Sequence, residues 1–226
     1  MRHPLDRPVW TALTTRHSPL ARGGPLAKRY PPAIVPFAAS ADGSAESLRA
    51  LEELVLPSDT VVMPQADDIA LPPGLAAVSI VKGVQMIADN QLQHVSDERI
   101  QRLTEADAAE MLALATLTKP GPFTLQAMSL GEFWGVKIDG RLAAMAGERM
   151  KQPGYTELSG VCSHPDFRGN GFGKLLSLHV AGNTFARGEI PYLHAYATNE
   201  TAIRLYESIG FKLRSSMNIA VVQRRS

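Results

Sequence analysis

The stretch Arg168-Gly169-Asn170-Gly171-Phe172-Gly173 decides how the rest of this sequence is interpreted. It follows a run of strand-forming residues and precedes a segment with helical periodicity, so its glycines stand at the start of a helix. Glycine inside a helix costs about 1 kcal/mol relative to alanine. Three glycines at alternate positions therefore indicate a turn whose backbone amides must stay accessible. Such amides, at the positive end of a helix dipole, form a site for phosphate.

The spacing of these glycines separates the common phosphate loops. A nucleotide-binding P-loop needs Gly-x-x-x-x-Gly-Lys-Ser/Thr, but Gly169 and Gly173 are four residues apart and Lys174 is followed by Leu175. The dinucleotide fingerprint Gly-x-Gly-x-x-Gly would need glycine in place of Lys174. Both patterns fail. The pattern Arg/Gln-x-x-Gly-x-Gly/Ala after a strand is filled at every specified position.

A second motif begins at Asn199, a residue that caps helix N-termini well, and ends before Gly210, which suits the position after a helix. Apolar side chains recur between them at i, i+3, i+4 and i+7, at Ala202, Leu205, Tyr206 and Ile209. The sequence therefore predicts an amphipathic helix over 199–209.

Strands and helices alternate around these two motifs. The predicted strands of the second half are 100–103, 133–138, 142–150, 155–162, 190–197 and 211–222. The predicted helices are 104–117, one that follows the glycine cluster and ends at about residue 187, and 199–209. Asp139-Gly140 is a hairpin signal between two apolar runs. This order predicts a mixed α/β (α+β) domain over residues 99–226.

The first 98 residues are rich in proline and carry no catalytic pattern. A helix is expected over 44–56, with short strands over 33–38, 60–63 and 76–87. The polar run 91–99 marks a boundary near residue 98. We therefore expect an N-terminal α/β region over 1–98, of unclear role.

Composition excludes several classes of protein. Lys and Arg number 23 against 22 Asp and Glu, so the formal net charge of +1 gives no reason to expect a nucleic-acid partner. One cysteine, Cys162, excludes an internal disulfide framework and fits a reducing compartment. Neither a secretory signal nor an apolar run of about 18 residues is present, so we expect a cytoplasmic protein without a membrane span.

The two motifs together resemble those of the GCN5-related N-acetyltransferase (GNAT) superfamily, and within it the FR47-like subgroup related to glycine N-acyltransferases. The resemblance runs over about residues 100–222, through Val161-Cys162-Ser163-His164-Pro165-Asp166-Phe167 into the glycine turn, and through Asn199-Glu200-Thr201-Ala202-Ile203-Arg204-Leu205-Tyr206. It implies a central mixed sheet splayed between its fourth and fifth strands, with flanking helices. Some relatives carry a degenerate second copy of the fold in the region that corresponds to 1–98.

The resemblance implies acetyl-CoA, or a close acyl-CoA, as the acyl donor. Its pyrophosphate is expected on the amides of 169–174, and its pantetheine arm on the strand at 161–163, much as an added β-strand would pair. The implied donor-binding residues are Val161, Cys162, Ser163, Arg168, Gly169, Asn170, Gly171, Phe172, Gly173, Lys174, Asn199, Ala202 and Tyr206.

Two residues are candidates for catalysis. The acceptor amine must be neutral to attack, and deprotonating a lysine-like amine at pH 7 costs about 4.6 kcal/mol, so a base or a desolvating pocket helps. Glu157 stands where histone-type relatives carry a general base, and it shares strand parity with Val161 unless a bulge intervenes. The alternative role for Glu157, which the sequence supports equally, is a carboxylate in the strand that forms an ion pair. Tyr206 matches the family tyrosine that protonates the leaving thiolate, and packing of its helix on the sheet is the alternative.

Other reactive side chains are assigned structural roles. Cys162 lacks a basic partner in the sequence, so a buried core thiol is favoured over an acyl-carrying nucleophile. His179 and His194 do not form a ligand pattern with other residues, and no metal is expected.

The resulting hypothesis is an N-acetyltransferase. It would transfer acetyl to the primary amine of a small molecule, amino acid or peptide N-terminus by direct attack in a ternary complex, with no nucleic-acid or membrane partner. The sequence leaves open whether the protein forms a homodimer. Two alternatives remain, a catalytically silent acyl-CoA-binding module that acts through a protein partner and a NAD-type domain.

Overall fold

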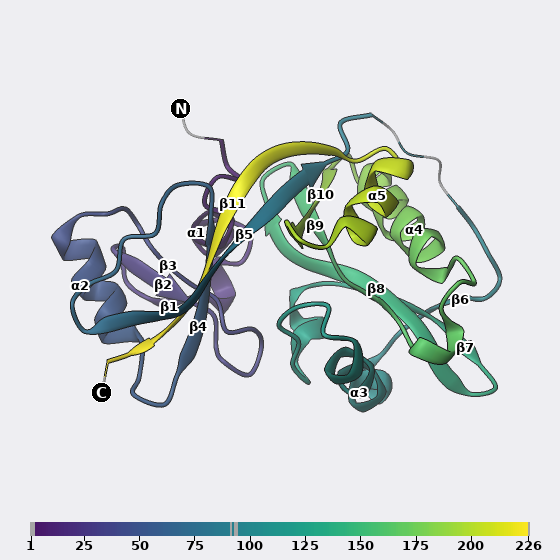
Figure 1. Ribbon diagram of the computed structural model, residues 1–226, viewed down its shortest axis with the longest axis horizontal. Helices are drawn as coiled ribbons and strands as arrows, with labels where there is room; N and C mark the ends of the chain where they lie inside the picture. The colour runs from purple at the N-terminus through teal and green to yellow at the C-terminus, as the bar shows by residue number, and fades with distance from the viewer. Residues whose placement is uncertain (1–2, 91, 93–94, 226) are drawn as a thin grey trace.

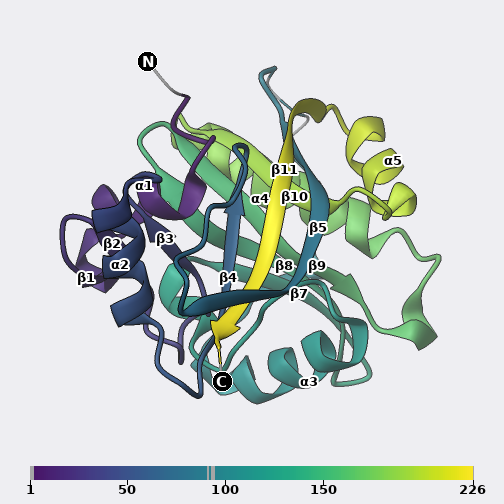
Figure 2. The same cartoon turned by 60° about the vertical axis from the view of Figure 1, so that its left-hand side comes forward.

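The computed structural model describes residues 3–90, 92 and 95–225. Two long antiparallel strands, β5 (Leu75–Ile87) and β11 (Lys212–Arg224), run side by side and connect two lobes of the molecule (Figure 1, Figure 2). Most elements of the first 98 residues lie at one end of this strand pair, and those that follow lie at the other (Figure 1).

The remaining elements are short to medium in length. In the N-terminal part they are α1 (Pro8–Thr14), β1 (Arg22–Gly23), β2 (Ala27–Arg29), β3 (Ala38–Ser40), α2 (Ala45–Leu54) and β4 (Thr60–Gln65). In the C-terminal part they are β6 (Ile100–Arg102), α3 (Ala108–Thr118), β7 (Phe133–Ile138), β8 (Arg141–Gln152), β9 (Tyr155–Ser163), α4 (Phe172–Ala186), β10 (Ile190–Tyr196) and α5 (Glu200–Ser208). Single 3₁₀ turns are at Ser18–Leu20, Glu105–Asp107, Ala127–Leu130 and Pro165–Phe167.

Eight strands form one mixed sheet in the order β4-β11-β5-β10-β9-β8-β7-β6. All neighbours are antiparallel except β9 and β10. This parallel pair is connected through α4, as a crossover between parallel strands requires. A separate three-stranded sheet has the order β1-β2-β3.

The parallel strands separate partway along their length. Tyr155 to Glu157 of β9 pair with Ile190 to Tyr192 of β10, whereas β9 continues to Ser163 and β10 to Tyr196. Counted from β6, these are the fourth and fifth strands, so the predicted splay is confirmed. It opens one edge of β9 along residues 158–163.

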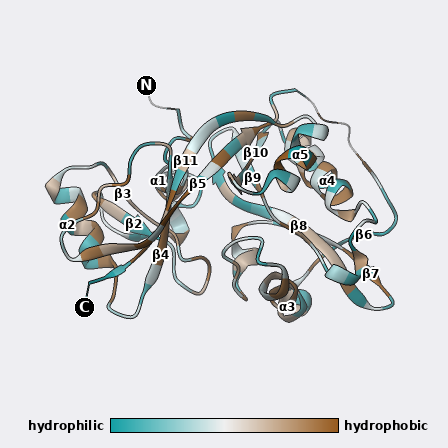
Figure 3. Ribbon diagram, viewed as in Figure 1, coloured by the Kyte–Doolittle hydropathy of each residue, from teal (hydrophilic) through white to brown (hydrophobic). Residues whose placement is uncertain are grey.

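Helices cover both faces of the sheet beside this opening. On one face, Leu176 and Val180 of α4 pack with Leu158 of β9, and α5 adds Tyr206 to the same cluster. On the other face, Met111 of α3 belongs to a separate cluster with residues of β7, β8 and β9. Hydrophobic residues also concentrate where β4, β5 and β11 cross (Figure 3).

Most predicted elements are confirmed. Ser44 caps α2, because its Oγ accepts from the Ser47 amide at 3.2 Å. Thr104 forms a capping box with Asp107 before α3. The strand expected over 33–38 is wrong, since β3 begins at Ala38. Pro36 and the prolines at 31 and 32 have no amide to donate, and the chain there makes turns.

The boundary near residue 98 stays a prediction. The main sheet runs across it, because β4 and β5 precede residue 98 and pair with β11, and β5 also pairs with β10. Part of the predicted polar seam at 91–99 lies outside the described residues. Sequence analysis also did not identify α1, which begins at Pro8 in a position where proline is favourable.

Candidate functional site

The glycine turn lies between β9 and α4, as predicted. Gly169 and Gly171 have φ of +82° and +75°, a left-handed conformation that favours glycine, and a Cβ on either would meet no described atom within 4 Å. Gly171 is the N-cap of α4 and has no side chain to cap it, and the Leu175 amide donates to its carbonyl at 3.0 Å. The amides of the first turn are thus not used by a side-chain cap.

The second motif forms α5, whose first turn is capped by Asn199. The Asn199 Oδ1 accepts from the Ala202 amide at 3.1 Å. One turn further, Tyr206 is 8% exposed and lies 6.0 Å from the Phe211 ring, centroid to centroid. Burial, with a smaller contribution from Cys162, raises the pKa of Tyr206 to about 12. Its phenol therefore keeps its proton at neutral pH, and burial makes it a weaker acid than an ordinary tyrosine.

A pocket opens at the splay between β9 and β10 and brings predicted residues together. Val161, Asn199, Ala202 and Tyr206 line one side of it. The other sides come from the N-terminal region, from the loop after α3 and from β8 and β10; they include Phe37, Val62, Pro64, Lys119, Gly121, Arg149 and His194. Cys162, Ser163 and the turn at 168–174 are not among its lining residues.

Glu157 lies behind this pocket and is fully buried. Its carboxylate accepts from Arg149 Nε at 2.9 Å, from Arg149 Nη2 at 2.7 Å, from the Met150 amide at 3.2 Å, and it lies 2.7 Å from His194 Nδ1. Burial opposes the charged form, but Arg149 and His194 outweigh it and lower the pKa of Glu157 to about 2. Both oxygens are occupied, so these contacts fit the ion-paired alternative better than a general base.

The hydrogen bonds around Gln85 assign the tautomer of His194. Arg214 Nε donates to Gln85 Oε1, and Gln85 Nε2 donates to the Leu5 carbonyl at 2.9 Å. Gln85 Nε2 therefore also donates to His194 Nε2, 2.8 Å away, which leaves Nδ1 to donate to Glu157. Neither nitrogen of His194 is available to accept a proton from an acceptor amine.

A β-bulge at Gly160 changes which face of the sheet the following side chains of β9 point to. Cys162 pairs with Met145 and Ser159 with Gly147, so β9 has an extra residue there, and Gly160 has φ of +64°. Val161 accordingly packs in the α4 cluster with Leu158, whereas Cys162 packs in the α3 cluster. Glu157 and Val161 therefore do not share a face, because a bulge, the exception stated for that expectation, shifts the alternation.

Cys162 is a buried thiol, as favoured from the sequence. It is 8% exposed. Burial raises its pKa to about 11, although hydrogen bonds from Thr118 and the Met145 backbone act in the opposite direction. Such a thiol is a poor nucleophile at neutral pH.

Arg149 and Lys119 are site residues that sequence analysis missed. Arg149 lies in the charged end of β8, directly after Glu148 and two residues before Lys151, so no local pattern distinguishes it as a pocket residue. Lys119 follows the helix predicted over 104–117 and belongs to no motif. Its place at the pocket depends on how α3 docks against the sheet, and no local pattern encodes that docking.

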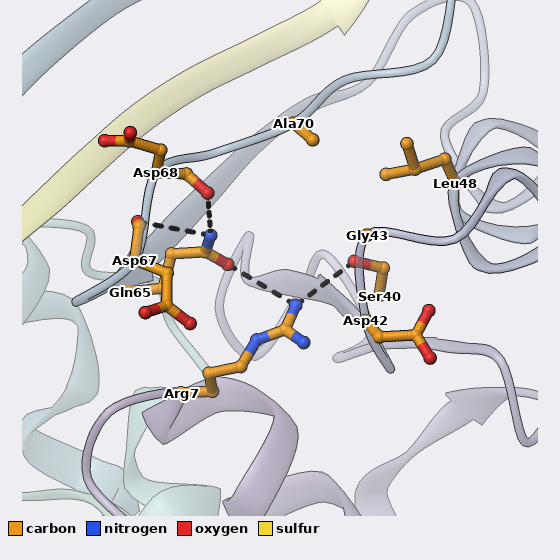
Figure 4. A pocket seen from close by; sticks show the side chains of 9 residues that line it. All are labelled: Arg7, Ser40, Asp42, Gly43, Leu48, Gln65, Asp67, Asp68 and Ala70. Carbon is orange, nitrogen blue, oxygen red and sulfur yellow. Dashed lines mark hydrogen bonds between the residues drawn. The ribbon is translucent and has the colours of Figure 1, made fainter. Parts of the chain in front are cut away.

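The described residues contain no group of three or more His, Cys, Asp and Glu side chains that could hold a metal ion. Within the same residues, no helix combines the length and the apolar character needed to cross a membrane. A further pocket lies between the N-terminal segment and the loop after β4 (Figure 4). There Arg7 donates to Ser40 Oγ at 3.2 Å and Gln65 Oε1 at 3.4 Å, so its polar groups bind one another, and none is a predicted site residue.

Comparisons with known proteins agree with this geometry. The family model of FR47-like proteins matches residues 135–219. A solved GNAT-family protein from Novosphingobium aromaticivorans is 43% identical, with a TM-score of 0.94 and coverage of 100% of both chains. The chain belongs to the GNAT family.

More distant solved structures share the fold alone. A GCN5-related N-acetyltransferase from Kribbella flavida has 17% identity and a TM-score of 0.62, with 95% of each chain covered. A GCN5-related N-acetyltransferase-like protein from Streptococcus suis has 14% identity and a TM-score of 0.60, with 96% of this chain and 94% of that chain covered. None of the curated proteins matches the chain.

Proposed function

We propose that the protein is an N-acetyltransferase that moves an acetyl group from acetyl-CoA to a primary amine by direct attack in a ternary complex. The observation that carries this proposal is the pocket at the splay, where Val161, Asn199, Ala202 and Tyr206 face residues of the N-terminal region. The donor's pyrophosphate would bind the amides of 169–174, with Arg168 and Lys174 adding charge. Its pantetheine would follow the open edge of β9 at 161–163.

In the proposed reaction the neutral amine attacks the thioester carbonyl carbon. The C–N bond forms, the C–S bond breaks, and the departing thiolate takes the phenol proton of Tyr206, while solvent receives the proton of the amine. Backbone amides of β9 at 161–163 would polarise the thioester carbonyl.

The pocket itself is proposed to supply the neutral amine. None of its lining residues, all within the described chain, is acidic, so no carboxylate there would stabilise the charged form of the amine. Partial burial also lowers the pKa of a bound ammonium group. This would assist deprotonation without a dedicated base, and Glu157 would act by positioning Arg149 and His194.

The test is turnover across a broad panel of primary amines, with thermal stabilisation by CoA as the binding measurement. We expect acetylated product and a rise in Tm with CoA. Clear CoA binding without product from any amine would reject the enzyme and favour the alternative of a silent acyl-CoA-binding module. Stabilisation by NAD but not by CoA would reject both. The free, buried state of the one cysteine supports the cytoplasm as the proposed location.

A further inference from the structure

The acceptor side of the pocket carries positive charge that the donor's phosphates do not explain. Lys119 and Arg149 line the pocket together with Tyr206, whereas the glycine turn proposed for the pyrophosphate does not line it. Tyr206 is proposed to act at the thioester, at the opposite end of the donor from its phosphates. The two cations therefore stand where the acceptor would bind.

Arg149 is held in place by its contacts, and its third guanidinium nitrogen, Nη1, is not used by them. Its Nε and Nη2 donate to Glu157, and its guanidinium carbon lies 5.0 Å from the centre of the Phe37 ring. Nη1 has no hydrogen bond to any residue that the structure describes. It lies near Gly121, because a Cβ atom built onto that glycine would be 3.8 Å from Nη1. The side chain keeps 13% of its surface exposed. An oriented, partly buried N–H group that lacks a partner is a ready donor for an anionic oxygen.

Lys119 supplies a second cation from the loop opposite β8. It ends α3 in a left-handed conformation, φ +51°, fixed by its own amide donating to the Ala115 carbonyl at 2.8 Å. Its side chain is exposed, lines the pocket and forms no ion pair with a described residue. Phe37, Val62, Pro64 and Ile219 make the rest of this side apolar.

On the basis of the proposed function, we infer that the acceptor is an apolar α-amino acid, whose carboxylate binds Arg149 Nη1 and the Lys119 ammonium while its side chain contacts the apolar wall. The α-amine is then fixed one carbon from the bound carboxylate, facing the thioester. Polyamines and other cationic amines are disfavoured, because they would bring further positive charge beside the Lys119 ammonium, which has no ion-pair partner among the described residues.

The first experiment compares amines that differ only in the carboxylate. L-phenylalanine, L-leucine and L-methionine are assayed against their carboxamides and against the decarboxylated amines, with spermidine as a cationic acceptor. A charge-assisted contact to each carboxylate oxygen predicts a kcat/KM at least about tenfold higher for the free amino acids. Equal or better turnover of the carboxamides and decarboxylated amines would overturn the inference and leave the acetyltransferase proposal standing. Absence of product from every amine, with CoA bound, would reject both.

The second experiment changes Lys119, which is exposed and does not hold the fold. Lys119→Gln should raise the KM for the amino acid by about tenfold, with little change in kcat and no change for the carboxamide, and Lys119→Arg should restore the KM. Lys212→Gln is the matched control, since it removes the same charge from a 63% exposed side chain outside the pocket. Equal effects of Lys119→Gln on amino acid and carboxamide, or of the two Gln variants on the amino acid, would contradict the assignment.

Discussion

Arg149 and Glu157 form a two-point ion pair between neighbouring strands, with Nε to Oε2 at 2.9 Å and Nη2 to Oε1 at 2.7 Å. The carboxylate has no exposed surface, while the guanidinium reaches the pocket. The pair therefore places a fixed cation in the pocket and keeps its carboxylate behind it. This arrangement supports the proposal that Glu157 positions Arg149 and does not itself accept a proton.

The first prediction concerns the stability that this pair contributes. Glu157→Gln removes the negative charge and leaves Arg149 buried without its counter-ion, so the free energy of unfolding should fall by about 3–5 kcal/mol. Urea denaturation at pH 7 measures this change in the free energy of unfolding. Glu200→Gln, which removes a carboxylate paired with Arg204 on the surface at 74% exposure, is the control and should cost less than about 1 kcal/mol. Equal losses in the two variants would show that burial of the pair contributes nothing.

The second prediction is the pH dependence of the same pair. The pKa of Glu157 falls from an ordinary 4.5 to about 2 on folding, so its stabilisation is fully present above about pH 4.5 and is lost as the pH falls towards 2. The difference in unfolding free energy between wild type and Glu157→Gln should therefore be constant from pH 5 to 7 and shrink below pH 4.5. The pH dependence of kcat/KM should show no acidic limb belonging to Glu157. A limb between pH 5 and 7 that disappears in Glu157→Gln would restore the general-base role.

The third prediction tests Tyr206 as the acid. Tyr206→Phe should lower kcat by about tenfold to a thousandfold with little change in CoA affinity, because only the proton transfer is removed. Steady-state kinetics and calorimetric titration of CoA measure the two quantities. Tyr155→Phe is the control, since its hydroxyl contacts His3 outside the pocket. An unchanged kcat in Tyr206→Phe would leave Tyr206 with a packing role alone.

The fourth prediction concerns the glycine turn. Gly171→Ala should weaken CoA binding by about tenfold or more, because a side chain there would hold the pyrophosphate away from the amides. Gly188→Ala is matched, since Gly188 has the same φ of +75° at the other end of α4 and the same open space around it. Both variants should lose a similar stability of about 1–2 kcal/mol. If both weaken CoA binding equally, backbone strain and not the loss of a phosphate site is the cause.

The fifth prediction concerns Cys162. With a pKa of about 11, roughly one thiol in a thousand is ionised at pH 8, and the side chain is buried. Iodoacetamide should modify it slowly in the native protein and at the ordinary rate in urea. Cys162→Ala should keep kcat within a few-fold of wild type, and loss of turnover in a folded variant would revive the acyl-enzyme alternative.

Local patterns were enough for much of the fold and for one side of the site. The glycine turn needs backbone conformations that few residues adopt, and the caps at Ser44, Thr104 and Asn199 each contact an amide within three residues. Such features depend only on residues that are close together in the sequence. The resemblance carried by the two motifs then implied the splayed sheet that the structure has.

Features that depend on distant contacts could not be predicted in this way. The bulge at Gly160 reversed the expected facing of Val161, because strand alternation does not reveal where a partner strand skips a residue. The charge network of Arg149, Glu157, His194 and Gln85 joins four strands, β8, β9, β10 and β5. Only the pairing of these strands shows that Glu157 is fully bonded.

By itself, the sequence determined the glycine turn, the capped helix that carries Tyr206 and the order of the strands around them, because each follows from backbone preferences over a few residues. The tertiary structure alone decided the chemistry of the pocket wall that is proposed to hold the acceptor. This wall combines Phe37 from the N-terminal region, Lys119 from the end of α3 and Arg149 from β8. The charge and burial that these side chains acquire come from how the sheet and the loops pack together, and no segment carries that information alone.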